Sequence, residues 1–413
     1  MFSKVNTIRR IGCVVAPLAA AVFAAAAAIP ATQAVTITYT SVSAGGDWQT
    51  STTWTGSGGT SPYTYPGYSE ADDTADITNG ATVTLNGSVP NDIGNLQIAG
   101  ASTFDQTGGS LTVASGYALY GGGAAATSAF YTISGGTLNL PGYYFGGSGA
   151  ATSTFTLDVT GGTVNSSHYT YVAEGGDGTL TVNSGTFNNT AGFQVAHSTG
   201  TGTINLNGGM FETTQPITGS ALTGSSYINF NGGTLQATAN ISSLLSSFTQ
   251  ANVQAGGAVF NTNGFDVGVS QNLLSDPTSS GGTDGGLIKD GTGTLTLSGT
   301  GNTYNGNTTV NGGTLEINSN FLARTSTVSI AANAVMDLNY SGTDIVQSLY
   351  LDGVLQNPGT YGYGQDGGIY NSFFTKTGTG TLTVSSIPEP ATLGLMAIGG
   401  LGILLAGKRR RRV

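Results

Sequence analysis

The chain has 413 residues, of which 67 are glycine and only 8% are charged, and its formal net charge is −10. Glycine costs about 1 kcal/mol at a helix-interior position, so this composition disfavours an all-helical protein. Residues 35–386 carry 20 acidic and three basic side chains, a net charge of −17, which argues against binding nucleic acid through its phosphates. The single cysteine, Cys13, falls in a predicted leader, so the rest of the chain has no disulfide and no thiolate chemistry.

Residues 1–34 have the pattern of a secretory signal peptide. Basic residues precede the apolar run IGCVVAPLAAAVFAAAAA, and the small-residue sequence ATQA ends at Ala34. This pattern predicts export and cleavage between Ala34 and Val35. The alternative is a buried N-terminal helix. Residues 35–101 follow the leader and are expected to form an N-terminal cap, because they contain both tryptophans, Trp48 and Trp54, and fall outside the repeat described next.

Residues 102–285 repeat a short glycine-containing unit. The second glycines of successive units are spaced by 27, 26, 23, 24, 24 and 24 residues, at Gly109, Gly136, Gly162, Gly185, Gly209, Gly233 and Gly257. Regular spacing of this kind indicates a solenoid or a repeat array. Residues 179–202 contain three short apolar-alternating stretches separated by glycine-containing turns, which predicts three strands in each coil.

The predicted fold is therefore all-β: a right-handed parallel β-helix of about 24–27 residues per coil, with terminal caps. One inward column is expected at the residue that follows each Gly-Gly turn at the same offset, namely Leu138, Val164, Phe187, Phe211 and Leu235. Asparagines that recur beside the strands are expected to hydrogen-bond along a ladder; they are Asn139, Asn165, Asn188, Asn205 and Asn231. Asn-Gly between alternating runs also favours antiparallel hairpins, which are the second architecture to consider.

Residues 286–318 read GLIKDGTGTLTLSGTGNTYNGNTTVNGGTLEIN. This segment resembles the autotransporter-associated β-strand repeat of secreted β-helical passengers, and KTGTGTLTV at 376–384 is a second, partial copy. Autotransporters end in a membrane barrel, whereas this chain ends in an apolar run and arginines, so the resemblance does not imply self-secretion. Residues 319–386 are turn-rich and are expected to form the C-terminal cap.

Residues 387–413 combine three features. Pro388, Glu389 and Pro390 precede a charge-free run of 17 residues, 391–407, and the basic cluster Lys408, Arg409, Arg410, Arg411 and Arg412 follows. The run predicts a short membrane helix, and the basic cluster predicts that its end stays cytoplasmic. The order of these parts resembles the PEP-CTERM sorting signal of Gram-negative bacteria. The resemblance implies processing by an exosortase-like enzyme; the alternative is a permanent single-pass anchor.

An aromatic column is expected on the third strand of four successive coils. It contains Tyr117, Tyr120, Tyr143, Tyr144, Phe145, Tyr169, Tyr171 and Phe193. If the rings are buried, they stack in the core; if they are exposed, they form a platform for the apolar faces of sugars. Tyr117, Tyr143, Tyr144, Tyr169, Tyr171 and Phe193 are the candidate glycan platform.

No constellation of residues predicts catalysis, a cofactor or a metal site. Asp72 and Asp73 lie in EADDTAD and are expected in a solvated turn, with Ca²⁺ binding beside Glu70 and Asp76 as the alternative. The two histidines, His168 and His197, fall at different positions of successive coils, so no shared metal site is expected.

The sequence thus predicts an exported, non-enzymatic, structural or adhesive β-solenoid. It would be anchored in the inner membrane before processing, and would then reach the surface, outer envelope or extracellular matrix of a Gram-negative bacterium. A glycan-binding module, with extracellular polysaccharide as its partner, is the first alternative. A β-helical polysaccharide lyase or hydrolase is the second.

Overall fold

The computed structural model describes residues 37–58, 64–68, 72–123, 127–149, 152–220, 222–276, 282–375 and 377–385. The chain divides into two units, residues 1–35 and 36–413, and everything described here belongs to the second unit. The predicted signal peptide and the predicted sorting signal, with its membrane helix, lie outside the described residues. Within the described ranges, no helix is long and apolar enough to cross a membrane.

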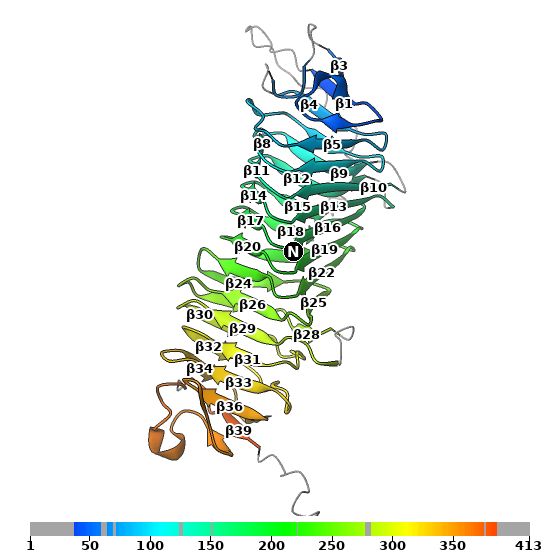
Figure 1. The fold of residues 1–413 in the computed structure, drawn as a ribbon. Helices are drawn as coiled ribbons and strands as arrows, with labels where there is room; N and C mark the ends of the chain where they lie inside the picture. The colour runs from blue at the N-terminus through cyan, green and yellow to red at the C-terminus, as the bar shows by residue number, and fades with distance from the viewer. Residues whose placement is uncertain are drawn as a thin grey trace, which may run out of the picture. The chain divides into compact units, whose positions relative to one another are not determined.

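Three long sheets make up most of this unit (Figure 1). Sheet A runs in the order β3 (Trp54–Ser57), β1 (Thr38–Ser41), β4 (Thr74–Ile77), β6 (Leu96–Ile98), β9 (Ala118–Gly123), β12 (Tyr143–Gly149), β15 (Thr170–Ala173), β18 (Phe193–Ala196), β21 (Ile217–Ser220), β24 (Ile241–Ser246), β27 (Val267–Val269), β30 (Thr294–Leu297), β32 (Thr314–Ile317) and β34 (Val335–Leu338). Sheet B runs in the order β2 (Gly46–Asp47), β5 (Thr82–Leu85), β7 (Thr103–Gln106), β10 (Ser128–Ile133), β13 (Thr154–Val159), β16 (Asp177–Val182), β19 (Thr201–Leu206), β22 (Ser225–Phe230), β25 (Gln250–Val253) and β28 (Leu273–Ser275).

Sheet C supplies the third side of each coil. Its strands are β8 (Ser110–Thr112), β11 (Thr137–Leu140), β14 (Thr163–Ser166), β17 (Thr186–Asn189), β20 (Met210–Thr213), β23 (Thr234–Ala237), β26 (Ala258–Asn261), β29 (Leu287–Asp290), β31 (Thr308–Val310), β33 (Thr327–Ile330), β36 (Ser348–Leu351) and β37 (Val354–Leu355). A small cap sheet contains β35 (Thr343–Val346), β39 (Thr381–Val384) and β38 (Gly359–Tyr361). Short 3₁₀ turns in the described ranges cover Ser51–Thr53 and Gln365–Gly368.

The predicted parallel β-helix is confirmed, with about 11 turns. One coil consists of β16, β17 and β18, and each of these strands pairs in parallel with the corresponding strand of the next coil, β19, β20 and β21. Among the described strands, antiparallel pairs occur only near the two ends, as β1 with β3, β36 with β37, and β38 with β39. The hairpin alternative is therefore wrong for the repeat.

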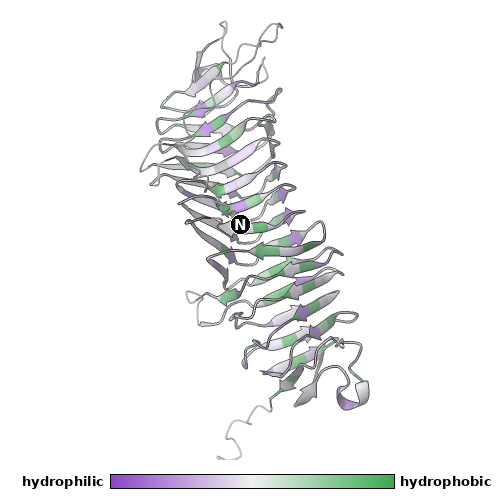
Figure 2. Cartoon of the chain, turned by 180° about the vertical axis from the view of Figure 1, so that it is seen from behind, coloured by the Kyte–Doolittle hydropathy of each residue, from purple (hydrophilic) through white to green (hydrophobic). Residues whose placement is uncertain are grey.

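The predicted inward column is also confirmed. Leu138 pairs with Val164, Val164 with Phe187, Phe187 with Phe211, and Phe211 with Leu235, and all five side chains are buried. Buried and less buried residues alternate along these strands, and Figure 2 shows the corresponding change of hydropathy along single strands. Stacked apolar side chains that face inward therefore form one continuous core.

Two hydrogen-bonded amide ladders run along the outside of the coils. On sheet C, Asn165 Nδ2 donates to Asn139 Oδ1 at 2.9 Å and Asn188 Nδ2 donates to Asn165 Oδ1 at 2.8 Å. On sheet B, Asn229 Nδ2 donates to Asn205 Oδ1 at 2.8 Å. Asn231 belongs to neither ladder, because it lies in a turn, where its Oδ1 accepts a hydrogen bond from the Gly256 backbone N–H.

The coils change where the autotransporter-like segment begins. Sheet B ends at β28, and strand registers from β29 onward repeat after about 20 or 21 residues instead of 24. On the third side of this coil, Thr303 N donates to Leu273 O at 2.9 Å and Asn302 Oδ1 accepts from Leu273 N at 2.8 Å. Non-strand residues thus cover the edge of sheet B, which would otherwise expose unpaired backbone groups.

Coils also extend into both ranges that were expected to be caps. Parallel pairing already joins β1 to β4 and β4 to β6, before residue 102. Trp48 and Trp54 are buried at this end with ring centroids 5.0 Å apart, and Trp54 Nε1 donates to Trp48 O at 2.8 Å. The two tryptophans therefore form core structure.

Candidate functional site

The predicted aromatic column separates into two sets because alternate residues of a strand face opposite sides. Tyr144 pairs with Leu119 and Thr170, and Thr170 pairs with Phe193, so Tyr144 and Phe193 lie in an inward column of sheet A. Both side chains are buried. The prediction that Tyr144 belongs to a glycan platform is therefore wrong, whereas Phe193, although buried, lines the cavity described below. Burial also raises the pKa of Tyr144.

The other set lies at the surface. Tyr143 is 36% exposed and Tyr169 is 53% exposed, whereas Tyr117 and Tyr171 are half-buried. Tyr144 on β12 pairs with Thr170 on β15. Tyr143 and Tyr169 each come directly before these paired residues, so the two exposed tyrosines occupy equivalent positions at one corner of successive coils. We call Tyr143, His168, Tyr169, Tyr171 and His197 the tyrosine patch.

Ring contacts make the tyrosine patch continuous. The His168 ring lies 4.2 Å from Tyr143 and 5.7 Å from Tyr169, measured between centroids. Tyr169 stacks on Tyr171 with an interplanar angle of 10° at 6.4 Å, and Tyr171 contacts His197 at 4.4 Å. The two histidines therefore border one aromatic surface. The sequence spacing did not predict the histidines here, because His168 and His197 fall at different positions of their coils.

A glycine makes room for the most exposed ring. A Cβ on Gly192 would lie 2.4 Å from Tyr169 Cε1, so this ring lies against the bare backbone of the next coil. A shallow cavity of about 240 Å³ follows, lined by Tyr169, Tyr171, Gly192, Phe193, Gln194, Gln215, Pro216 and Thr218. Aromatic faces beside amide and hydroxyl groups suit a sugar, whose rings have an apolar face and a hydroxylated edge.

Burial shifts the pKa of two titratable groups in this region. Burial raises the pKa of Glu174, and the nearby His197 partly offsets this effect. Burial and the neighbouring Tyr169 and Glu174 likewise raise the pKa of Tyr171. In the part of the chain that the structure describes, the lysines and arginines are Lys289 and Arg324, and neither lines the cavity.

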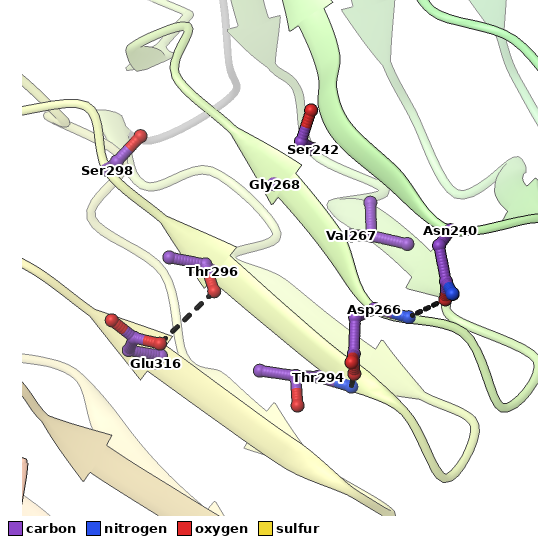
Figure 3. Close-up of a pocket in the computed structure, with 9 residues that line it drawn as sticks. All are labelled: Asn240, Ser242, Asp266, Val267, Gly268, Thr294, Thr296, Ser298 and Glu316. Carbon is purple, nitrogen blue, oxygen red and sulfur yellow. Dashed lines mark hydrogen bonds between the residues drawn. The ribbon is translucent and has the colours of Figure 1, made fainter.

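A larger groove of about 660 Å³ crosses the outer face of sheet A (Figure 3). It is lined by Asn240, Ser242, Asp266, Val267, Gly268, Thr294, Thr296, Ser298 and Glu316. Asp266 Oδ1 accepts from Thr294 N at 3.0 Å, while Glu316 Oε2 accepts from Thr296 Oγ1 at 3.2 Å. Two strand spacings and two residues separate the carboxylates, about 12 Å between Cα atoms, and Figure 3 shows Asp266 and Glu316 bonded to different threonines rather than facing one another.

The acidic segment near the N-terminal end differs from its prediction. Asp73 is buried, and its Oδ2 accepts a hydrogen bond from Gly67 N at 3.0 Å, so it is not part of a solvated turn. Asp76 lies on β4 and burial raises its pKa, while Glu70 lies outside the described residues. In the described part of the chain, no group of three or more His, Cys, Asp or Glu side chains is placed to hold a metal ion.

Comparison with known proteins identifies two parts of the chain. No curated protein and no solved structure matches it. Residues 287–317 and 374–386 match the passenger-associated-transport-repeat, which covers the autotransporter-like segment and its partial copy. Residues 386–412 match the PEP-CTERM protein-sorting motif. With its β-solenoid fold, the chain is thus a secreted β-helical protein of the Gram-negative envelope that carries a PEP-CTERM sorting motif of the kind recognised by exosortases.

Proposed function

We propose that this protein is a non-enzymatic adhesin of the envelope or extracellular matrix, and that it attaches to neutral glycans through the tyrosine patch. The exposure of Tyr143 and Tyr169 carries the proposal, because the same aromatic column would be only core packing if all its rings were buried. His168 joins the two exposed rings, so they offer one surface to a sugar chain. The shortage of basic side chains supports a neutral ligand rather than a polyanionic one.

Binding of the purified full-length protein to matrix polysaccharide from its host tests the proposal. Tyr143→Ala and Tyr169→Ala should each weaken binding by about 1 kcal/mol or more, roughly fivefold in Kd, because each removes a stacking face. Gly192→Ala should weaken it as well, because the new methyl group displaces the Tyr169 ring without removing it. Tyr363→Ala is the matched control, since Tyr363 is 42% exposed but lies in the C-terminal cap. Equal binding by all four variants would refute the tyrosine patch as the binding site.

Absence of catalysis is part of the same proposal. Inverting hydrolysis needs two carboxyl groups about 6.5 to 9.5 Å apart that face one bond, whereas Asp266 and Glu316 each bond to a neighbouring strand. We expect no cleavage of pectin, alginate or the host polysaccharide, measured by release of reducing ends and of unsaturated uronates. Turnover that disappears in Asp266→Asn or Glu316→Gln would instead support the hydrolase or lyase alternative.

A further inference from the structure

Two carboxylates lie side by side at the C-terminal end of sheet A. Glu316 on β32 and Asp337 on β34 are paired in parallel register, and both occupy outward positions between buried neighbours. Paired residues on adjacent parallel strands are about 4.8 Å apart. Like charges directly opposite one another destabilise a sheet, so this pair needs a compensating partner.

Asp337 is also shielded from water. Although it faces outward, it is only 5% exposed. The returning chain lies alongside β34, where Met336 N donates to Phe373 O at 2.9 Å and Met336 forms a parallel bridge with Phe374. Asp337 Oδ1 has no hydrogen-bond partner among the described residues. A buried carboxylate oxygen without a donor is costly, because neither water nor protein replaces its hydration.

A second oxygen without a partner lies on the same face. Asn318 follows Glu316 by two residues, directly after the end of β32, so it continues the outward alternation, and its Oδ1 is buried with no donor. Glu316 accepts one hydrogen bond on each oxygen, from Thr296 Oγ1 and from Asn339 Nδ2, which leaves further lone pairs. The donor set is therefore all oxygen, from two carboxylates and one amide, and this is the chemistry that Ca²⁺ prefers.

We propose that Glu316, Asp337 and Asn318 bind Ca²⁺ on the outward face of β32 and β34, at the end of sheet A. The ion would neutralise the paired carboxylates and satisfy both partnerless oxygens. With only two charged ligands, the affinity belongs to the range of extracellular modules, about 10⁻⁴ to 10⁻³ M. Such a site would fill only where Ca²⁺ reaches about 10⁻⁴ to 10⁻³ M. The proposal is independent of glycan binding, because the tyrosine patch lies on other coils.

The test measures thermal unfolding and calcium binding of the full-length protein. After EDTA treatment, addition of about 10 mM CaCl₂ should raise the unfolding midpoint by about 2 °C or more, and isothermal titration should report one site. Asp337→Asn and Glu316→Gln should each weaken Ca²⁺ binding at least tenfold. Both variants should fold in EDTA at least as stably as the wild type, because each removes half of the repulsive pair.

Asp352→Asn is the matched control. Asp352 is exposed in the same end of the chain with φ 49°, a conformation that asparagine also adopts, and it should leave the calcium response unchanged. The proposal is overturned if calcium raises the midpoint no more than magnesium or potassium chloride of equal ionic strength does. It is also overturned if the response of Asp337→Asn equals that of the wild type.

Discussion

Lys289 on β29 lies directly beside Phe260 on β26 in the inward column of sheet C. The whole lysine side chain is buried. Its Nζ, which carries three N–H donors, lies 2.8 to 3.0 Å from four acceptor oxygens, Thr262 Oγ1 and the carbonyl oxygens of Asp290, Gly291 and Gly312. The lysine thus links three consecutive coils at the point from which the strand registers shorten to about 20 or 21 residues. Its Nζ supplies the hydrogen bond to the Gly291 and Gly312 carbonyl oxygens, whereas Asp290 O also accepts from Thr262 N.

Lys289→Met should therefore destabilise the protein by about 2 to 4 kcal/mol, although methionine suits an apolar column, because the carbonyl oxygens of Gly291 and Gly312 lose their donor. Urea denaturation of the purified protein measures this change. Ile288→Met, on the outward side of the same strand, should cost less than about 1 kcal/mol. If Lys289→Met were as stable as the wild type, packing beside Phe260 would outweigh the hydrogen bonds.

The same lysine predicts a pH dependence. Burial lowers its pKa from 10.5 to about 8. Between these two values the unfolded chain binds the proton and the folded protein does not, so the stability of the wild type rises with pH. Relative to Lys289→Met, the free energy of unfolding should gain up to roughly 3 kcal/mol between pH 8 and 10.5. A constant difference between the two proteins across this range would contradict the shift.

The inward position of Lys289 could not be predicted from the sequence. The 24-residue spacing predicted the coil, its three strands and the inward column, because burial repeats with the backbone period. Lys289 was also found in the autotransporter-like segment. However, the sequence alone does not show that this charged side chain points inward. Likewise, the aromatic column was found by its spacing. Which of Tyr143 and Tyr144 is exposed depends on which residue of the strand faces inward, and the spacing does not give this. The burial of Asp337 depends on the returning segment 373–375, which lies outside the periodic repeat and could not be placed from the sequence.

Leu235→Asp tests the solenoid core. Leu235 is 1% exposed between Phe211 and Phe260, so the carboxylate would be buried without a partner and should cost several kcal/mol, about 3 to 5. Circular dichroism during thermal unfolding reports the loss. Thr234→Asp, one residue earlier on the outward face, should remain within about 1 kcal/mol of the wild type. Equal stability of the two variants would contradict the inward column.

Glu212→Gln should stabilise the protein. Glu212 pairs with Asn188 in the ladder of sheet C, yet it has no donor to offer, and Asn188 Oδ1 is buried without a partner. Glutamine would supply that donor and keep the hydrogen bond from Gln236 Nε2, now 2.6 Å long. The expected gain is about 1 kcal/mol in urea denaturation. Glu212→Ala, which supplies no donor and loses the bond to Gln236, should lower stability instead. A gain in both variants would point to charge removal rather than ladder completion.

Asp344→Asn should change how the free energy of unfolding depends on pH below about pH 7. Burial raises the pKa of Asp344 from 3.8 to about 6, even though Tyr340 Oη and Leu322 N both donate to it. Between these values the folded protein binds the proton and the unfolded chain does not, so wild-type stability falls as pH rises from 4 to 6. The variant should lack this fall and exceed the wild type by up to roughly 3 kcal/mol at pH 7. Asp352→Asn should retain the wild-type profile. Parallel profiles for all three proteins would contradict a titrating Asp344.

Processing of the C-terminus decides between a sorting signal and a permanent anchor. Residues 386–412 match the PEP-CTERM motif, and Pro388 and Pro390 disfavour helix before residue 391. We expect these prolines to leave an extended segment outside the hydrocarbon, where an exosortase-like enzyme can reach the chain and remove the tail. Mass spectrometry of the protein from its host should then find a mature end near Glu389 and a mature start at Val35. Replacing Pro388, Glu389 and Pro390 with alanine should leave uncleaved protein in the inner membrane. Recovery of Arg409 to Val413 in the surface-exposed protein would refute processing. A permanent anchor keeps this basic cluster, whereas a processed sorting signal loses it.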